Sequence, residues 1–186
     1  MPELMIDYII SLDGYAAADD WPGLWGMGGP DYFAWLAQQE PRTSLMGATT
    51  YRLMSGMAEE EPEAFAELAR MDKVVFSSTL TEPLGWANTR LVNGDPVETV
   101  RAMKEGDGPT LSTLGSLTLS RSLLVAGLVD RFRVVVFPVI NGATGRERIF
   151  DGYPDVLLEL VESRTFDGRL QLLDYVPTVL DHPPLA

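Results

Sequence analysis

The chain has 186 residues, of which 46% are hydrophobic, and its formal net charge at pH 7 is −13. This length and composition argue against disorder and suit one globular domain with a substantial core. The negative charge argues against nucleic acid as a partner, because phosphate backbones are bound by clustered Lys and Arg. The charge still permits a phosphorylated small molecule held by backbone N–H groups. The sequence has no Cys, so disulfides, thiolate metal sites and cysteine nucleophiles are excluded.

The N-terminus has neither the basic flank nor the long apolar region of a signal peptide, and no apolar run reaches membrane-spanning length. We therefore expect a cytoplasmic protein without a membrane partner. The chain has no internal repeat and no linker rich in Pro, Gly or Ser. We expect a single domain over residues 1–180, followed by a short tail over 181–186.

The predicted elements alternate between strands and helices. A mostly apolar first strand over 3–11 is followed by a long irregular connection with many glycines, over 11–30. The helix expected over 31–39 places Phe33, Leu36 and Ala37 at helical spacing. Further strands are expected over 43–47, 73–78, 89–92, 109–116 and 131–140, and further helices over 49–56, 62–70, 96–106 and 117–127.

Two alternating runs near the C-terminus flank Asp167-Gly168, a residue pair suited to a two-residue hairpin turn. Parallel strands with covering helices and an antiparallel hairpin at the end predict a mixed α/β sheet. Ligands of such sheets bind beyond the carboxyl ends of the strands.

Three of these strand ends combine small side chains with hydroxyl groups. They are Gly47-Ala48-Thr49-Thr50, Ser77-Ser78-Thr79 and Gly115-Ser116-Leu117-Thr118. The first and third run directly into a helix, whose N-terminal N–H groups and positive dipole end suit a phosphate. The alternative is that these residues only cap helices and form turns, as Ser, Thr and Gly commonly do. The sequence has neither a GxGxxG motif nor a P-loop, so spacing alone does not identify a ligand.

Six segments, read together, carry a family resemblance: SLDGYAA, PDYFAWLAQQ, LMGATTY, VVFSST, LGSLTLSRSLLVAGLVD and FPVINGATGRERIF. From about Leu4 to Val176 the chain resembles the dihydrofolate reductase superfamily, in the branch that contains the reductase domain of bacterial riboflavin biosynthesis. The resemblance implies an eight-stranded sheet that binds NADPH at its strand ends and passes a hydride to a pterin, pyrimidine or related heterocycle. It also implies a homodimer, for which the strand over 131–140 and the terminal hairpin are the expected contact surface.

The resemblance further assigns residues to the cofactor. Those expected near the phosphates are Gly47, Ala48, Thr49 and Thr50, together with Leu114, Gly115, Ser116, Leu117 and Thr118 at the pyrophosphate. Those expected by the adenosine ribose and its 2′-phosphate are Ser77, Ser78 and Thr79, and those flanking the nicotinamide are Ile9, Ala16 and Ala17.

Two positions depart from the family pattern. Relatives usually carry Arg at Ala48, where it pairs with phosphate oxygens, and they carry glycines around Ser116 and Leu117. Losing one charge-assisted hydrogen bond lowers affinity about tenfold to a hundredfold. NADPH, NADH and another ligand therefore all stay open. A non-catalytic nucleotide- or small-molecule-binding protein on the same fold is the alternative function.

Asp31 is the candidate catalytic and substrate-binding residue. In the folate-reducing branch an acidic residue at the corresponding point contacts the pterin ring and assists protonation, which makes a C=N bond a better hydride acceptor. The alternative is a capping or dipole role, since Asp after Pro is common in a first helical turn. Asp13 and Trp25 are further substrate-binding candidates, although Asp13 could simply order its turn and Trp25 could staple the long loop. We expect no metal, since no His or Cys ligand set accompanies the acidic residues.

Overall fold

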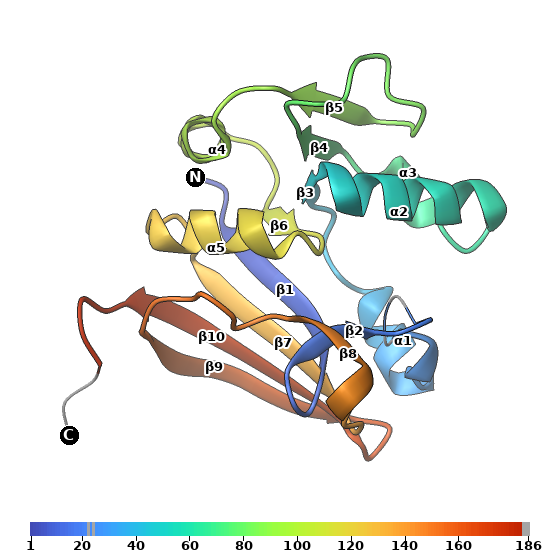
Figure 1. The fold of residues 1–186 in the computed structure, drawn as a ribbon, viewed down its shortest axis with the longest axis vertical. Helices are drawn as coiled ribbons and strands as arrows, with labels where there is room; N and C mark the ends of the chain where they lie inside the picture. The colour runs from blue at the N-terminus through green and yellow to red at the C-terminus, as the bar shows by residue number, and fades with distance from the viewer. Residues whose placement is uncertain (22, 24, 184–186) are drawn as a thin grey trace. The chain divides into compact units, whose positions relative to one another are not determined.

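Within residues 1–21, 23 and 25–183, which the computed structural model describes, eight strands form the main sheet. They are β1 (Leu4–Ser11), β3 (Thr43–Gly47), β4 (Lys73–Phe76), β5 (Thr89–Val92), β6 (Leu111–Thr113), β7 (Arg131–Phe137), β9 (Val156–Phe166) and β10 (Leu170–Val179). Their order is β5-β4-β3-β6-β1-β7-β10-β9 (Figure 1). The pairs from β5 to β1 are parallel, whereas β7-β10 and β10-β9 are antiparallel. The predicted mixed α/β sheet with a C-terminal hairpin is confirmed.

The flanking helices are α1 (Pro30–Leu36), α2 (Ala48–Glu60), α3 (Ala66–Arg70), α4 (Pro96–Glu105) and α5 (Leu117–Val125). Short 3-10 turns, η1 (Trp25–Met27) and η2 (Gly142–Thr144), lie in the connections. Helix α2 is longer than predicted, since it extends to Glu60, and α3 is shorter, since it begins only at Ala66. None of the helices in the described part of the chain has the length and apolar character that a membrane span requires.

The chain divides into two compact units. Unit 1 comprises Met1–Ile6 and Pro41–Val129, and unit 2 comprises Asp7–Glu40 and Asp130–Ala186. Strand β1 therefore contributes its first residues to unit 1 and the remainder to unit 2. That residues 1–180 act as one domain stays a prediction.

Unit 1 has a parallel sheet whose strands are short. All four residues of β4 are buried, as expected for a strand covered on both faces. Met46, Tyr51, Val75 and Trp86 form a buried cluster between α2 and the sheet. The register of β3 and β6 places Leu45 beside Thr113, so these two strands end at the same edge.

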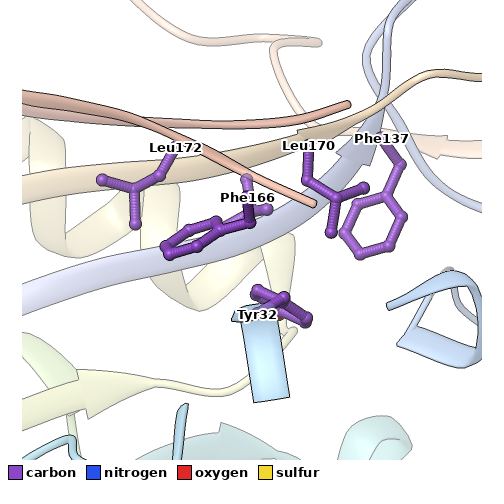
Figure 2. Packing of buried hydrophobic residues seen from close by; sticks show 6 residues of the cluster. Tyr32, Phe137, Phe166, Leu170 and Leu172 are labelled. Atoms are coloured by element: carbon purple, nitrogen blue, oxygen red, sulfur yellow. The ribbon is translucent and has the colours of Figure 1, made fainter. Parts of the chain in front are cut away.

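Unit 2 is built around Tyr32 of α1, which is 1% exposed. Figure 2 shows its ring among buried side chains of the antiparallel strands, which are Phe137, Phe166, Leu170 and Leu172. Val135 of β7 belongs to the same cluster. The predicted apolar face of this helix is wrong, because Phe33 and Leu36 are 48% and 40% exposed. Tyr32 and Trp35 face inward instead, since their large rings reach and fill the space below the strands.

The connection over 11–30 is not wholly irregular, which corrects the prediction. It contains β2 (Tyr15–Ala18), which pairs antiparallel with β8 (Gly145–Arg148) to form a separate two-stranded sheet (Figure 1). Strand β2 is a short run of Tyr and Ala, but β8 has three charged residues after its glycine, and the two strands lie far apart in the sequence. Local periodicity therefore carries no signal for this pair.

Candidate functional site

Ser116 joins the N-terminal ends of α2 and α5 in unit 1. Its Oγ accepts a hydrogen bond from the backbone N–H of Gly47 at 2.8 Å and donates one to Thr50 Oγ1 at 2.8 Å. The first and third hydroxyl-rich strand ends are thus neighbours, because β3 and β6 are adjacent parallel strands.

Neither helix is capped by the side chain of its own N-cap residue. Helix α2 follows Gly47, which has no side chain, and α5 follows Ser116, whose hydroxyl is used on Gly47 and Thr50. The capping interpretation therefore does not hold at these two ends. Uncapped N–H groups and the positive ends of two helix dipoles suit an anion.

The backbone before α5 adds to this arrangement. Gly115 has φ 55° and Ser116 has φ 59°, and both lie in the left-handed region. A Cβ at Gly115 would lie 3.1 Å from Thr50 Oγ1, so the tight packing also favours glycine. A left-handed residue followed by helical ones directs successive N–H groups into one concavity, a geometry that binds anions.

The other residues assigned to the phosphates line the same two helix starts. Ala48, Leu114 and Leu117 are half-buried, while Thr49 and Thr118 are exposed. None of the residues in this set is cationic. A phosphate here would be held by N–H groups and hydroxyls, without the charge-assisted pair that Arg provides.

The third strand end behaves differently, because a turn and not a helix follows β4. Ser77 Oγ accepts hydrogen bonds from the backbone N–H groups of Thr79 and Leu80, each at 3.1 Å. The turn-forming interpretation accounts for this hydroxyl. Ser78 and Thr79 are exposed.

Asp13, in unit 2, orders the turn after β1. Its carboxylate accepts hydrogen bonds from Ser11 Oγ at 2.6 Å, from Asn141 N–H at 3.2 Å and from Gly142 N–H at 2.9 Å. These bonds, led by that from Ser11, lower the pKa of Asp13 to about 2. The turn-ordering alternative accounts for these contacts, and a substrate contact stays a prediction.

Asp31 lies in the first turn of α1 and is exposed. Its backbone N–H and that of Tyr32 are bound by the carboxylate of Asp167, at 3.0 and 3.2 Å. Within the described residues the Asp31 carboxylate itself has neither a hydrogen bond nor an ion pair. Asp167 was not among the sequence candidates, since its DG pair signals only a turn.

The remaining candidates of unit 2 lie on β1, β2 and η1. Ile9 packs against the Tyr32 cluster, and Ala16 and Ala17 are half-buried on β2. Trp25 begins η1, but its side chain lies outside the described part of the structure. The residues assigned to the nicotinamide and substrate thus belong to unit 2, and those assigned to the phosphates belong to unit 1. In the described ranges no group of three or more His, Asp or Glu is placed to hold a metal ion.

Comparison with known proteins identifies the family. The family model of the RibD C-terminal domain matches residues 2–172. The uncharacterized protein YyaP of Bacillus subtilis is 26% identical over 178 residues, which cover 92% of this chain and 93% of that protein.

Two solved structures show the same fold. A putative riboflavin biosynthesis protein from Shewanella sp. PV-4 superposes with a TM-score of 0.73 at 20% identity, covering 95% of this chain and 99% of the other. Dihydrofolate reductase from Enterococcus faecalis, solved in complex with NADP(H), has a TM-score of 0.61 at 13% identity, covering 94% and 96%. With the family model spanning nearly its whole length, the chain belongs to the RibD C-terminal domain family and has the dihydrofolate reductase-like fold.

Proposed function

We propose that the chain is an NADPH-dependent reductase that transfers a hydride to a pterin, pyrimidine or related heterocycle. Membership of the RibD C-terminal domain family supports an oxidoreductase, and the likeness to a reductase solved with NADP(H) supports the cofactor. The observation that carries the proposal is the pair of uncapped helix starts joined by Ser116.

The residues present fit a dinucleotide phosphate. The N–H groups at the starts of α2 and α5 would bind its oxygens, with Thr49 and Thr118 as exposed hydroxyl donors. Gly115 keeps the backbone free of a side chain where Thr50 already packs closely. When bound, the reduced nicotinamide supplies the hydride.

Asp31 is the acid of this proposal. A carboxyl group beside a ring nitrogen can hold or deliver the proton that makes the adjacent C=N bond more electrophilic. Its carboxylate is exposed and, within the described residues, forms no bond that would compete with a substrate. Asp13 suits the role less well, because its oxygens already accept three hydrogen bonds.

Calorimetric titration with NADPH and NADH tests the cofactor, with Ala48→Arg as the informative variant. We expect the new guanidinium to raise NADPH affinity about tenfold to a hundredfold, because it adds a charge-assisted hydrogen bond to phosphate. Leu53→Arg, at an exposed position of the same helix, is the matched control and should leave the affinity unchanged. If neither cofactor binds the parent or the Ala48→Arg variant, the reductase proposal fails.

The second candidate is a non-catalytic nucleotide- or small-molecule-binding protein on the same fold. Ala48 and the half-buried Leu117 favour it, because both replace groups with which relatives hold phosphate. Tight NADPH binding without turnover of dihydrofolate or aminopyrimidines, in the parent and in Ala48→Arg alike, would support this alternative.

We also propose that the chain forms a homodimer through β9. Strand β7 lies inside the sheet and is largely buried, so the exposed apolar surface belongs to the hairpin. Strand β9 is at the sheet edge, and its adjacent residues Leu160 and Val161 are 54% and 51% exposed. Native proteins normally protect such edges with charge or cover.

The partner best suited to this edge is a second copy of β9. Exposed apolar residues are consecutive, so they occupy both faces of the strand, and a helix docked on one face would leave the other uncovered. An antiparallel copy continues the sheet and places its own apolar side chains beside those of β9 on both faces. In that arrangement Glu159 of each copy can lie opposite the exposed Arg164 of the other, which is a complementary charge pair.

A further inference from the structure

Helix α1 is capped by a residue from the far end of the chain. Asp167 Oδ1 accepts the N–H of Asp31 at 3.0 Å, and Oδ2 accepts the N–H of Tyr32 at 3.2 Å. The N-cap residue of this helix is Gly29, which has no side chain to accept either bond. The Asp167 carboxylate therefore does what a Ser, Thr, Asp or Asn at the N-cap usually does.

Asp167 is held in place by the hairpin turn between β9 and β10. It has φ 51°, a left-handed conformation that Asp tolerates. The residues on either side of the turn, Phe166 and Leu170, are buried in the cluster that contains Tyr32 (Figure 2). The hydrophobic contact and the two hydrogen bonds thus join the same two segments.

A further hydrogen bond and a close backbone approach join the same two segments. Arg169 Nη2 donates to the carbonyl oxygen of Met27 at 2.8 Å, just before α1. A Cβ at Gly29 would overlap the Asp167 carboxylate, so glycine is needed there for the close approach. Asp167 can therefore reach the helix start only because the N-cap residue, Gly29, has no side chain.

This cap changes what Asp31 can do. An Asp in a first helical turn ordinarily directs its carboxylate toward the free N–H groups of that turn. In α1 two of these groups are already bound by Asp167. The Asp31 side chain is exposed and unbonded within the described residues, as a group that meets a ligand should be.

We propose that Asp167 is a positioning residue, which caps α1 in place of Asp31 and so leaves the Asp31 carboxylate free for the heterocycle. The functional half of this statement rests on the proposed reductase activity. The capping half does not, so the two are tested separately.

A double-mutant cycle tests the capping half. Asp167→Gly removes the carboxylate without strain, because glycine adopts φ 51° freely. In the Asp167→Gly background the Asp31 carboxylate should turn toward the free N–H groups and become the cap. Asp31→Ala should then raise the unfolding equilibrium constant, measured in urea, about fivefold. In the parent protein we expect Asp31→Ala to change the unfolding equilibrium constant by less than about twofold. An equal effect of Asp31→Ala in both backgrounds would overturn the proposal.

Steady-state kinetics of heterocycle reduction test the functional half. Asp167→Gly should lower kcat/KM about tenfold, and Asp167→Asn, which keeps one acceptor oxygen, should restore part of the loss. Asp20→Gly is the control, because Asp20 is another Asp with positive φ in unit 2, and it is exposed whereas Asp167 is half-buried.

The outcomes are distinguishable. If Asp31→Asn abolishes turnover while Asp167→Gly matches Asp20→Gly, Asp167 does not position Asp31 and the inference is wrong. If Asp31→Asn retains full turnover, Asp31 is not the acid, and the functional half of the inference falls with that role. If the parent reduces no heterocycle, the proposed function and this half fail together, and the double-mutant cycle alone decides whether Asp167 replaces Asp31 as the cap.

Discussion

At position 116 a serine occupies a backbone conformation that glycine adopts at lower cost. A left-handed non-glycine residue costs about 1 kcal/mol, and the two hydrogen bonds of the Ser116 hydroxyl return about 1 kcal/mol each. Ser116 is therefore tolerated in this conformation because its hydroxyl ties β3 to α5. The same two bonds keep the hydroxyl from capping α5.

Asp13 makes stability depend on acidic pH. Its pKa is lowered to about 2 in the folded protein by hydrogen bonds to the carboxylate, whereas 3.8 is the ordinary value. A lowered folded pKa means that the stabilisation is present above about pH 4 and is lost as the pH falls toward about 2. Asp13→Asn should therefore lower the free energy of unfolding at pH 6, and the gap from the parent should close between about pH 4 and pH 2.

Urea unfolding at pH 6, 4 and 2.5 measures this difference. Asp20→Asn, at an exposed position without a hydrogen bond in the described residues, is the control. A gap between parent and Asp13→Asn that stays constant over this range would contradict the assignment.

Helix α3 has only five residues and is closed by the buried ammonium of Lys73. Lys73 Nζ donates to the carbonyl oxygens of Leu68, Ala69 and Met71, and lies 4.7 Å from the ring centroid of Trp86. Burial lowers the pKa of Lys73, yet these acceptors satisfy all three of its protons. Lys73→Met removes the donor to Leu68 and Met71, while the Ala69 carbonyl keeps its bond from Asn88 Nδ2, so it should cost about 2 kcal/mol or more of unfolding free energy.

Chemical denaturation checks this value, with Arg70→Met on the same helix as the control. Arg70 is exposed, so its replacement should change the unfolding free energy by less than about 0.5 kcal/mol. A Lys73→Met variant as stable as the parent would show that the Leu68 and Met71 carbonyls find other donors.

The elements that sequence reasoning predicts well are those whose signal is local. Strand β3 ends at Gly47 as expected, and β5 matches its predicted range. Strand β8 is charged and has no apolar signal, and its pairing with β2 comes from tertiary contacts. The inward face of α1 was wrong for a related reason, since the strands beneath it select Tyr32 over Phe33.

The candidate site, too, could be predicted from the sequence only in part. The hydroxyl-rich strand ends are visible in the sequence, whereas the adjacency of β3 and β6, which makes the starts of α2 and α5 neighbours, is known only from the structure. The role of Asp167 does not, because its contact with Asp31 depends on how the hairpin packs on α1. An Asp-Gly pair predicts the same hairpin turn whether or not that turn packs against another element.

At the scale of the whole molecule, β9 makes a prediction about assembly. Leu160→Glu places a charge in the proposed interface, so it should convert the dimer to monomer or weaken it at least tenfold, as measured by light scattering over a concentration series. Leu53→Glu, an exposed leucine on α2, is the control and should remain dimeric. A parent that is monomeric at every concentration would exclude the β9 interface.

The division of the chain also sets an order for folding during synthesis. Unit 1 needs residues 1–6 and 41–129, so all of it is available once Val129 has left the ribosome. Unit 2 is discontinuous, and residues 7–40 must wait for β7, β9 and β10 at the other end of the chain. Until Asp167 and β10 emerge, α1 lacks its cap, and Tyr32 lacks the buried side chains of Leu170 and Leu172. A nascent chain arrested after β7 should therefore protect unit 1 from protease and leave α1 open to cleavage.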